Sequence, residues 1–141
     1  MTDPRIKHAA NWLARFTVNG VPPSDFHDVL ASIERWEDWC RAWSARAKVH
    51  ETLGHEALAE RHFVSAGEHL GRAAALYHFA KYLFVNDMKE MRAAHRRAVA
   101  CLTLACPIST RLASGSPYPM KASTSRPPCD APTGSRGHRW C

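Results

Sequence analysis

Tyr77, His78 and Lys81 are the side chains of this sequence whose types and spacing could do chemistry together. They fall in the stretch Tyr77-His78-Phe79-Ala80-Lys81, and a helix brings side chains three and four residues apart onto one edge. A phenol, an imidazole and an ammonium group on one edge could position a polar substrate or dock against another domain. The simpler interpretation, to which we give more weight, is that Tyr77 belongs to the core while His78 and Lys81 are solvated.

The elements of familiar catalytic chemistry are missing from the sequence, which has no G-x-S-x-G, H-E-x-x-H, phosphate-loop or G-x-G-x-x-G motif. His50 and His55 are five residues apart, which does not align them on one helical face, and Cys101 and Cys106 share that spacing. We therefore assign no catalytic residue and expect no metal site and no cofactor. The five cysteines form no C-x-x-C pair, so we interpret them as buried or incidental thiols.

Trp36, Trp39 and Trp43 form the most prominent apolar pattern. Together with Ala47 they follow spacings of three, four and four residues, which place them on one face of a helix. Because a tryptophan buries a large area, this stripe must face something substantial. We predict that the three Trp side chains form an interface stripe.

Proline, glycine and capping residues divide the first 106 residues into helical segments. Pro4 opens a segment that runs to about Phe16. The run TVNGVPPS breaks it, and we expect Ser24 to cap the next helix. The Trp stripe begins a longer helix near Arg35, which we expect to loosen around Gly54 and then to resume.

Two capping-box patterns introduce the remaining helices. Ser65-Ala-Gly-Glu68 precedes one apolar stripe, and Asp87-Met-Lys-Glu90 precedes another that we expect Pro107 to end. The predicted fold class is all-α, with about four to five helices in consecutive antiparallel hairpins. Alternation of small and large apolar residues also suits a tetratricopeptide-like repeat, but the sequence has no convincing self-similarity at a period of about 34 residues.

Composition limits what the chain can be. With 141 residues and 45% hydrophobic content it can form one domain with a modest core. No run of about 18 apolar residues occurs and the first residues lack a signal-peptide core, so we expect no membrane span and a cytoplasmic location. The net charge is +6, but residues 107–141 carry five Lys or Arg against Asp130 and so supply four of the six excess charges. Because no basic face is evident, nucleic acid is an unlikely partner.

The order of these features resembles the N-terminal helical segment of a group of α/β-hydrolases, which includes dihydroxypseudooxynicotine hydrolase and the fermentation–respiration switch type esterases. The resemblance covers about residues 10–107. It rests, in order, on Trp36, Trp39, Trp43, Gly54, Ser65-Ala66-Gly67-Glu68, Arg72-Ala73-Ala74, the run from Tyr77 to Phe84, Asp87, and Arg97-Ala98-Val99 before a proline.

Membership would imply that this helical segment caps a catalytic domain with a Ser–Asp–His triad, which hydrolyses an ester, an amide or an activated C–C bond. The chain departs from the pattern because it stops where the catalytic sheet should begin, so no triad residue can be assigned. We expect a truncated cap segment that is inactive alone. Its partners would be the missing catalytic domain or other copies of itself, through exposed apolar faces. The alternative is a small helical protein–protein interaction module that uses the Trp stripe.

The last part of the chain, residues 107–141, differs from the rest in being basic and rich in Pro and Ser. We predict a helical domain over residues 1–106 followed by a disordered tail. In a shifted reading frame, the codons that span Met120–Lys121 and Trp140–Cys141 would encode Glu and Val. The residues that the other shifted codons can encode resemble the linker and first strand of the hydrolase group. Our hypothesis is that the tail is frameshift-derived. A genuine disordered basic tail is the alternative.

Overall fold

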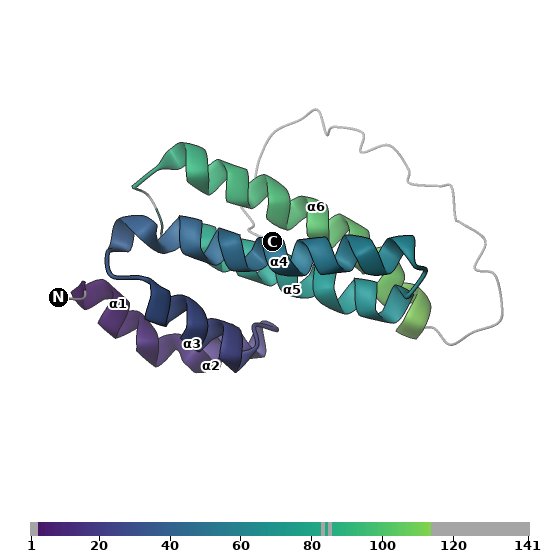
Figure 1. Ribbon diagram of the computed structural model, residues 1–141, viewed down its shortest axis with the longest axis horizontal. Helices are drawn as coiled ribbons and strands as arrows, with labels where there is room; N and C mark the ends of the chain where they lie inside the picture. The colour runs from purple at the N-terminus through teal and green to yellow at the C-terminus, as the bar shows by residue number, and fades with distance from the viewer. Residues whose placement is uncertain (1–2, 83, 85, 114–141) are drawn as a thin grey trace, which may run out of the picture.

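The structure, a computed structural model, describes residues 3–82, 84 and 86–113 (Figure 1). Within these residues it contains helices and no strand, so the predicted all-α fold is confirmed. From residue 114 on, the predicted disordered tail lies outside the described residues. The elements are α1 (Pro4–Ala9), a 3₁₀ turn (Ala10–Trp12), α2 (Leu13–Val18), α3 (Pro23–Ser32), a second 3₁₀ turn (Trp36–Asp38), α4 (Trp39–Ala59), α5 (Phe63–Lys81) and α6 (Met88–Ala113).

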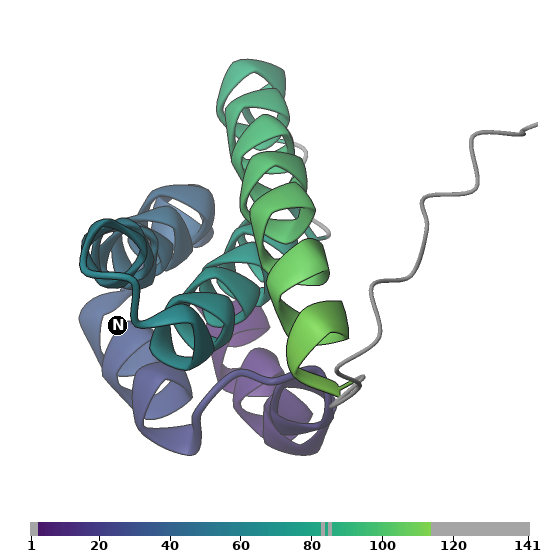
Figure 2. The same ribbon diagram turned by 90° about the vertical axis from the view of Figure 1, so that its right-hand side faces the viewer.

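The long helices α4, α5 and α6 form the body of the molecule, and α5 lies between the other two (Figure 2). A tight turn joins α4 to α5 and makes them an antiparallel hairpin. In that turn Arg61 has a φ of 62°, a left-handed conformation that often ends a helix, and His62 N donates to Ala57 O at 2.8 Å. The short helices α1, α2 and α3 pack against one end of this hairpin (Figure 1).

The Trp stripe lies in the core of the chain itself. Trp36 is 5% exposed, and Trp39 and Trp43 are 0% exposed. Phe16 of α2 stacks on Phe79 of α5 with ring centroids 3.7 Å apart, and its ring also packs against Trp39 and Trp43. The interpretation of the three Trp side chains as an interface stripe for a partner outside the chain is therefore wrong. Segments that precede the stripe in the sequence fold back and cover it.

Helix α4 is continuous through Gly54, so the predicted loosening at this residue is wrong. A Cβ atom at Gly54 would lie 2.7 Å from Leu70 Cγ and 3.2 Å from the Leu70 backbone nitrogen. Glycine is needed here because α5 approaches α4 closely, not because the helix must break.

Of the predicted helix caps, one is confirmed and two are wrong. Asp87 caps α6 as predicted, since its Oδ1 accepts from the backbone nitrogens of Lys89 at 2.7 Å and Glu90 at 3.0 Å. Ser65 does not cap α5, because that helix already begins at Phe63. Ser24 likewise lies inside α3, which begins at Pro23.

Pro107 lies inside α6 and does not end it, so that prediction is also wrong. A proline costs a helix one hydrogen bond and a steric contact with the preceding turn. Packing on either side outweighs this local cost, because Ala105 is buried and Ile108 packs against the core. The helical part therefore crosses the boundary predicted at residue 106 and extends to Ala113.

Candidate functional site

Tyr77 lies at the centre of a polar network that joins the three long helices. Its side chain is buried, and its hydroxyl donates to Glu51 Oε2 of α4 at 2.8 Å. Arg97 of α6 donates from Nη1 to the Tyr77 oxygen at 3.0 Å and to Glu51 Oε2 at 2.6 Å. Lys48 Nζ lies 3.2 Å from the same carboxylate oxygen. The Glu51 carboxylate thus accepts a hydrogen bond from the Tyr77 hydroxyl and pairs with two cations, Arg97 and Lys48.

The environment fixes the charges in this network. Burial, outweighing the hydrogen bond from Arg97, raises the pKa of Tyr77 to about 12, so the phenol stays protonated near neutral pH. Partial burial opposes ionisation of Glu51, but the hydrogen bonds from Tyr77 and Lys48 and the charge of Arg97 outweigh it, and the pKa of Glu51 lies below its usual value. Neither group is poised to exchange protons near pH 7, so neither is suited to act as a general acid or base.

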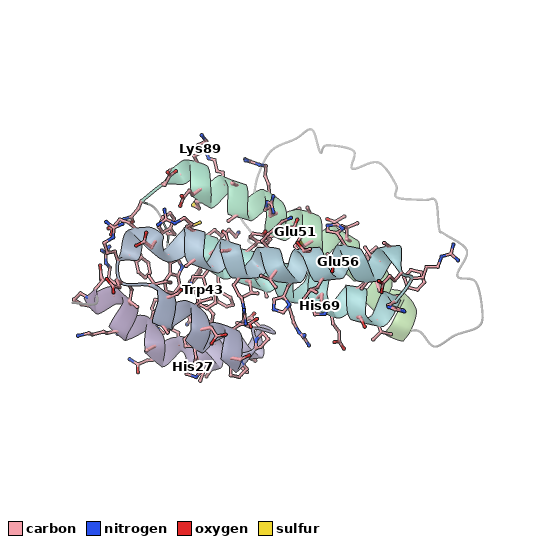
Figure 3. All side chains as sticks on the ribbon, in the orientation of Figure 1. His27, Trp43, Glu51, Glu56, His69 and Lys89 are labelled. Atoms are coloured by element: carbon pink, nitrogen blue, oxygen red, sulfur yellow. The ribbon has the colours of Figure 1, made fainter. Side chains whose placement is uncertain are left out.

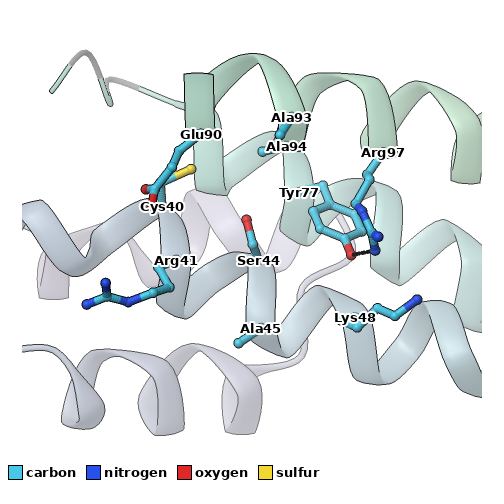
Figure 4. Close-up of a pocket in the computed structure, with 10 residues that line it drawn as sticks. All are labelled: Cys40, Arg41, Ser44, Ala45, Lys48, Tyr77, Glu90, Ala93, Ala94 and Arg97. Carbon is cyan, nitrogen blue, oxygen red and sulfur yellow. Dashed lines mark hydrogen bonds between the residues drawn. The ribbon is translucent and has the colours of Figure 1, made fainter. Parts of the chain in front are cut away.

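A cleft of about 370 Å³ opens between α4 and α6 beside this network (Figure 4). Cys40 lines one end of it, but burial raises the pKa of this thiol to about 11, so it is not an activated nucleophile. The cleft is lined by Cys40, Arg41, Ser44, Ala45, Lys48, Tyr77, Glu90, Ala93, Ala94 and Arg97.

His78 and Lys81 lie at a different place from Tyr77, so the predicted convergence of all three side chains is only partly realised. Both line a second groove, between α5 and α6, that the side chain of Tyr77 does not reach. Lys81 Nζ lies 3.1 Å from His95 Nδ1 of α6. Burial, with the charges of Lys81 and His95, lowers the pKa of His78. The structure therefore replaces the predicted Tyr77–His78–Lys81 cluster by a His78–Lys81–His95 cluster.

A hydrogen-bonded Asp–His–His chain connects α3, α4 and α5, and sequence reasoning missed it. Its first two members are buried and its third, His69, is half-buried. Asp25 and His50 are both buried, and His50 Nε2 lies 2.7 Å from Asp25 Oδ2. The other ring nitrogen of His50 lies 3.1 Å from His69 Nδ1. Arg46 Nε donates to the second Asp25 oxygen at 2.9 Å. In Figure 3, His69 and Glu51 lie toward opposite edges of the α4–α5 pair, so this chain and the Tyr77 network are separate.

When both imidazoles of the Asp25–His50–His69 chain are neutral, the geometry fixes which nitrogen of each ring carries the proton. A carboxylate only accepts hydrogen bonds, so the Nε2–H of a neutral His50 points to Asp25 and its Nδ1 accepts from His69. His69 is then left with Nε2 as its acceptor. Burial lowers the pKa of His69, and the charge of Arg72, with the charge that His50 carries when it is protonated, lowers it further. No local sequence pattern could reveal the contacts among Asp25, His50 and His69, because each residue comes from a different helix.

Among the described residues, no group of three or more His, Cys, Asp or Glu side chains could hold a metal ion. Asp25, His50 and His69 bond to one another in series, so their ligand atoms do not converge on one point. Among the described helices, none is both long and apolar enough to cross a membrane. Cys40 and Cys101 are buried thiols, as expected for two of the five cysteines. Comparisons of the chain with known protein families, with curated proteins and with solved structures find no match.

Proposed function

We propose that this chain is a cytoplasmic, non-catalytic helical module: the cap segment of a serine α/β-hydrolase that docks on a separate catalytic domain. The order of the Trp, Gly54, Tyr77 and Arg97 motifs supports the family, as it resembles the helical segment of that group. The absence of a nucleophile elbow from the sequence supports a non-catalytic role.

The observation that carries the docking role is the groove between α5 and α6. Val99 is 49% exposed and Leu102 is 53% exposed along α6, although both are large apolar side chains. Both line the groove, and the polar side chains of His78 and Lys81 stand in the same groove. An apolar strip beside polar groups is typical of surfaces that contact another protein domain.

The first test is the nucleotide sequence from codon 100 to several hundred bases beyond codon 141. The proposal expects a neighbouring open frame that encodes strands and a G-x-S-x-G elbow. If no such frame exists, the hydrolase assignment is wrong.

The second test asks whether that encoded domain binds the groove. Both polypeptides are co-expressed, and association is measured by co-purification and analytical ultracentrifugation. Leu102→Asp places a charge in the apolar strip and should abolish association. Val49→Asp is the matched control, since Val49 is 49% exposed on α4, and no residue of α4 lines the groove. Equal association of both variants would contradict docking through this groove.

A second candidate function, the helical interaction module, is favoured by exposed apolar residues elsewhere. Phe63 and Val64 at the start of α5 are 53% and 56% exposed. Since the Trp face is buried, such a module would use these residues or the groove between α5 and α6. Self-association through them predicts a sedimentation coefficient that rises with protein concentration, and a value independent of concentration would contradict it.

A further inference from the structure

The cleft between α4 and α6 has the volume of a small-molecule site. Its volume of about 370 Å³ lies within the range of ligand pockets. The middle of the cleft is lined by small side chains, Ser44 and Ala45 from α4 and Ala93 and Ala94 from α6, which leave the space between the two helices unfilled (Figure 4). Most of the lining is therefore apolar, with charged side chains at the two ends.

One end of the cleft is acidic. Glu90 stands there, next to Cys40 (Figure 4), and within the described residues its carboxylate makes no hydrogen bond or ion pair. Arg41 lies at the same end, but its guanidinium pairs with the Asp38 carboxylate. The carboxylates of Glu90 and Asp87 add to the effect of burial in raising the pKa of the Cys40 thiol, which is the effect of uncompensated negative charge.

The opposite end is basic. Lys48 and Arg97 both pair with Glu51, so two cations share one carboxylate and one positive charge is left over. Their side chains are 53% and 48% exposed, which leaves donors available to a ligand. Tyr77 holds Arg97 in place through the hydrogen bond to its hydroxyl (Figure 4).

We propose that this cleft binds a small amphipathic zwitterion, with an ammonium-type cation at Glu90, a carboxylate at Lys48 and Arg97, and a short hydrocarbon segment between them. Glu90 and Arg97 are seven residues apart on α6, which separates their backbone positions by about 10 Å. A ligand with a charge at each end matches both ends at once, whereas a ligand with one charge matches only one. The inference concerns residues of this chain alone and does not rest on the hydrolase proposal.

The experiment is a titration of the isotope-labelled full-length chain with ε-aminocaproate, followed by amide chemical shifts. Caproate lacks the ammonium group and hexylamine lacks the carboxylate, so they serve as ligands with a single charge. We expect saturable shifts at residues that line the cleft on α4 and α6, and dissociation constants about tenfold higher for both single-charge ligands.

Variants separate the two ends of the site. Glu90→Gln should weaken ε-aminocaproate about tenfold and leave caproate binding unchanged, while Lys48→Gln should weaken both. Ala93→Leu should fill the cleft and abolish binding of all three ligands. Glu68→Gln is the matched control, because Glu68 is an exposed carboxylate of α5 outside the cleft.

Three outcomes would overturn the proposal. The first is the absence of saturable shifts in the cleft with ε-aminocaproate. The second is binding that Glu90→Gln and Glu68→Gln change equally. The third is caproate binding as tightly as ε-aminocaproate, which would make the cleft an anion site rather than a zwitterion site. Unfolding curves of each variant show whether its fold is intact.

Discussion

The two ends of the α4–α5 hairpin are packed by different means. At the end covered by α1 to α3, Trp39 and Trp43 pack among aromatic rings contributed by α2, α3 and α5 (Figure 1). At the other end, Gly54 and Leu70 bring the two helix backbones into direct contact. Large side chains require a further layer of structure to bury them, whereas small ones let two helices approach without one.

Removing a ring from the aromatic end should have the largest effect. Trp39→Ala is expected to lower the free energy of unfolding by about 3–5 kcal/mol, because the ring is fully buried and a cavity would remain. It also removes the hydrogen bond from Trp39 Nε1 to Phe79 O at 3.0 Å. Urea unfolding followed by circular dichroism measures the change. Val49→Ala, at an exposed position of α4, should change stability by less than about 0.5 kcal/mol.

The Asp–His–His chain lies between the two ends, and breaking it should have the next largest effect. Asp25→Ala leaves His50 and Arg46 without their common acceptor and should cost about 2–3 kcal/mol. Asp28→Ala is the matched control, because Asp28 also pairs with Arg46 but its side chain is 65% exposed. The control should cost less than about 1 kcal/mol. Similar losses of stability in the two variants would show that burial of the Asp25–His50–His69 contacts contributes little to the free energy of unfolding.

Gly54 of α4 and Gly71 of α5 should respond to substitution in opposite directions. Gly54→Ala introduces a clash with Leu70 and should destabilise by about 1–2 kcal/mol, even after the gain in helix propensity. A Cβ at Gly71 meets nothing within 4 Å, so Gly71→Ala should stabilise by about 0.5–1 kcal/mol. Both are measured by urea unfolding. A stabilising Gly54→Ala would refute the close approach of α4 and α5.

The pH dependence of stability should show the smallest effect. The pKa of His69 is lower in the folded chain than its ordinary value of 6.5, so the unfolded chain binds the proton more tightly. The contribution of His69 to stability is therefore fully present above pH 6.5 and is lost as pH falls from there through the folded pKa.

His69→Gln should make stability less sensitive to pH below this value. The free energy of unfolding is measured by urea at several pH values for both proteins. Their difference well above pH 6.5 reports only the lost contact with His50 and serves as the reference. An unchanged slope in the variant would contradict the assignment to His69.

The fold was largely accessible from the sequence, but the candidate sites were not. Helical spacing correctly identified the apolar faces of α4 and α5, and Asp87 was correctly assigned as a cap. On α6 it was right for Ala94, Ala98 and Ala105 but wrong for Leu102, which is 53% exposed. The errors at Gly54 and Pro107 have one origin. Each prediction used the residue's local preference to loosen or end a helix, and packing between helices outweighed that preference.

By itself the sequence determined that the described part of the chain is helical and where most of its apolar stripes lie, because helical periodicity and caps act over a few residues. Only the tertiary structure decided what covers each stripe and which polar groups meet. Asp25 and His50 are 25 residues apart, and Glu51 and Arg97 are 46 apart, so no spacing rule connects them. The Trp stripe predicted a large partner surface, and the folded chain supplies that surface itself, from its first 33 residues and from α5.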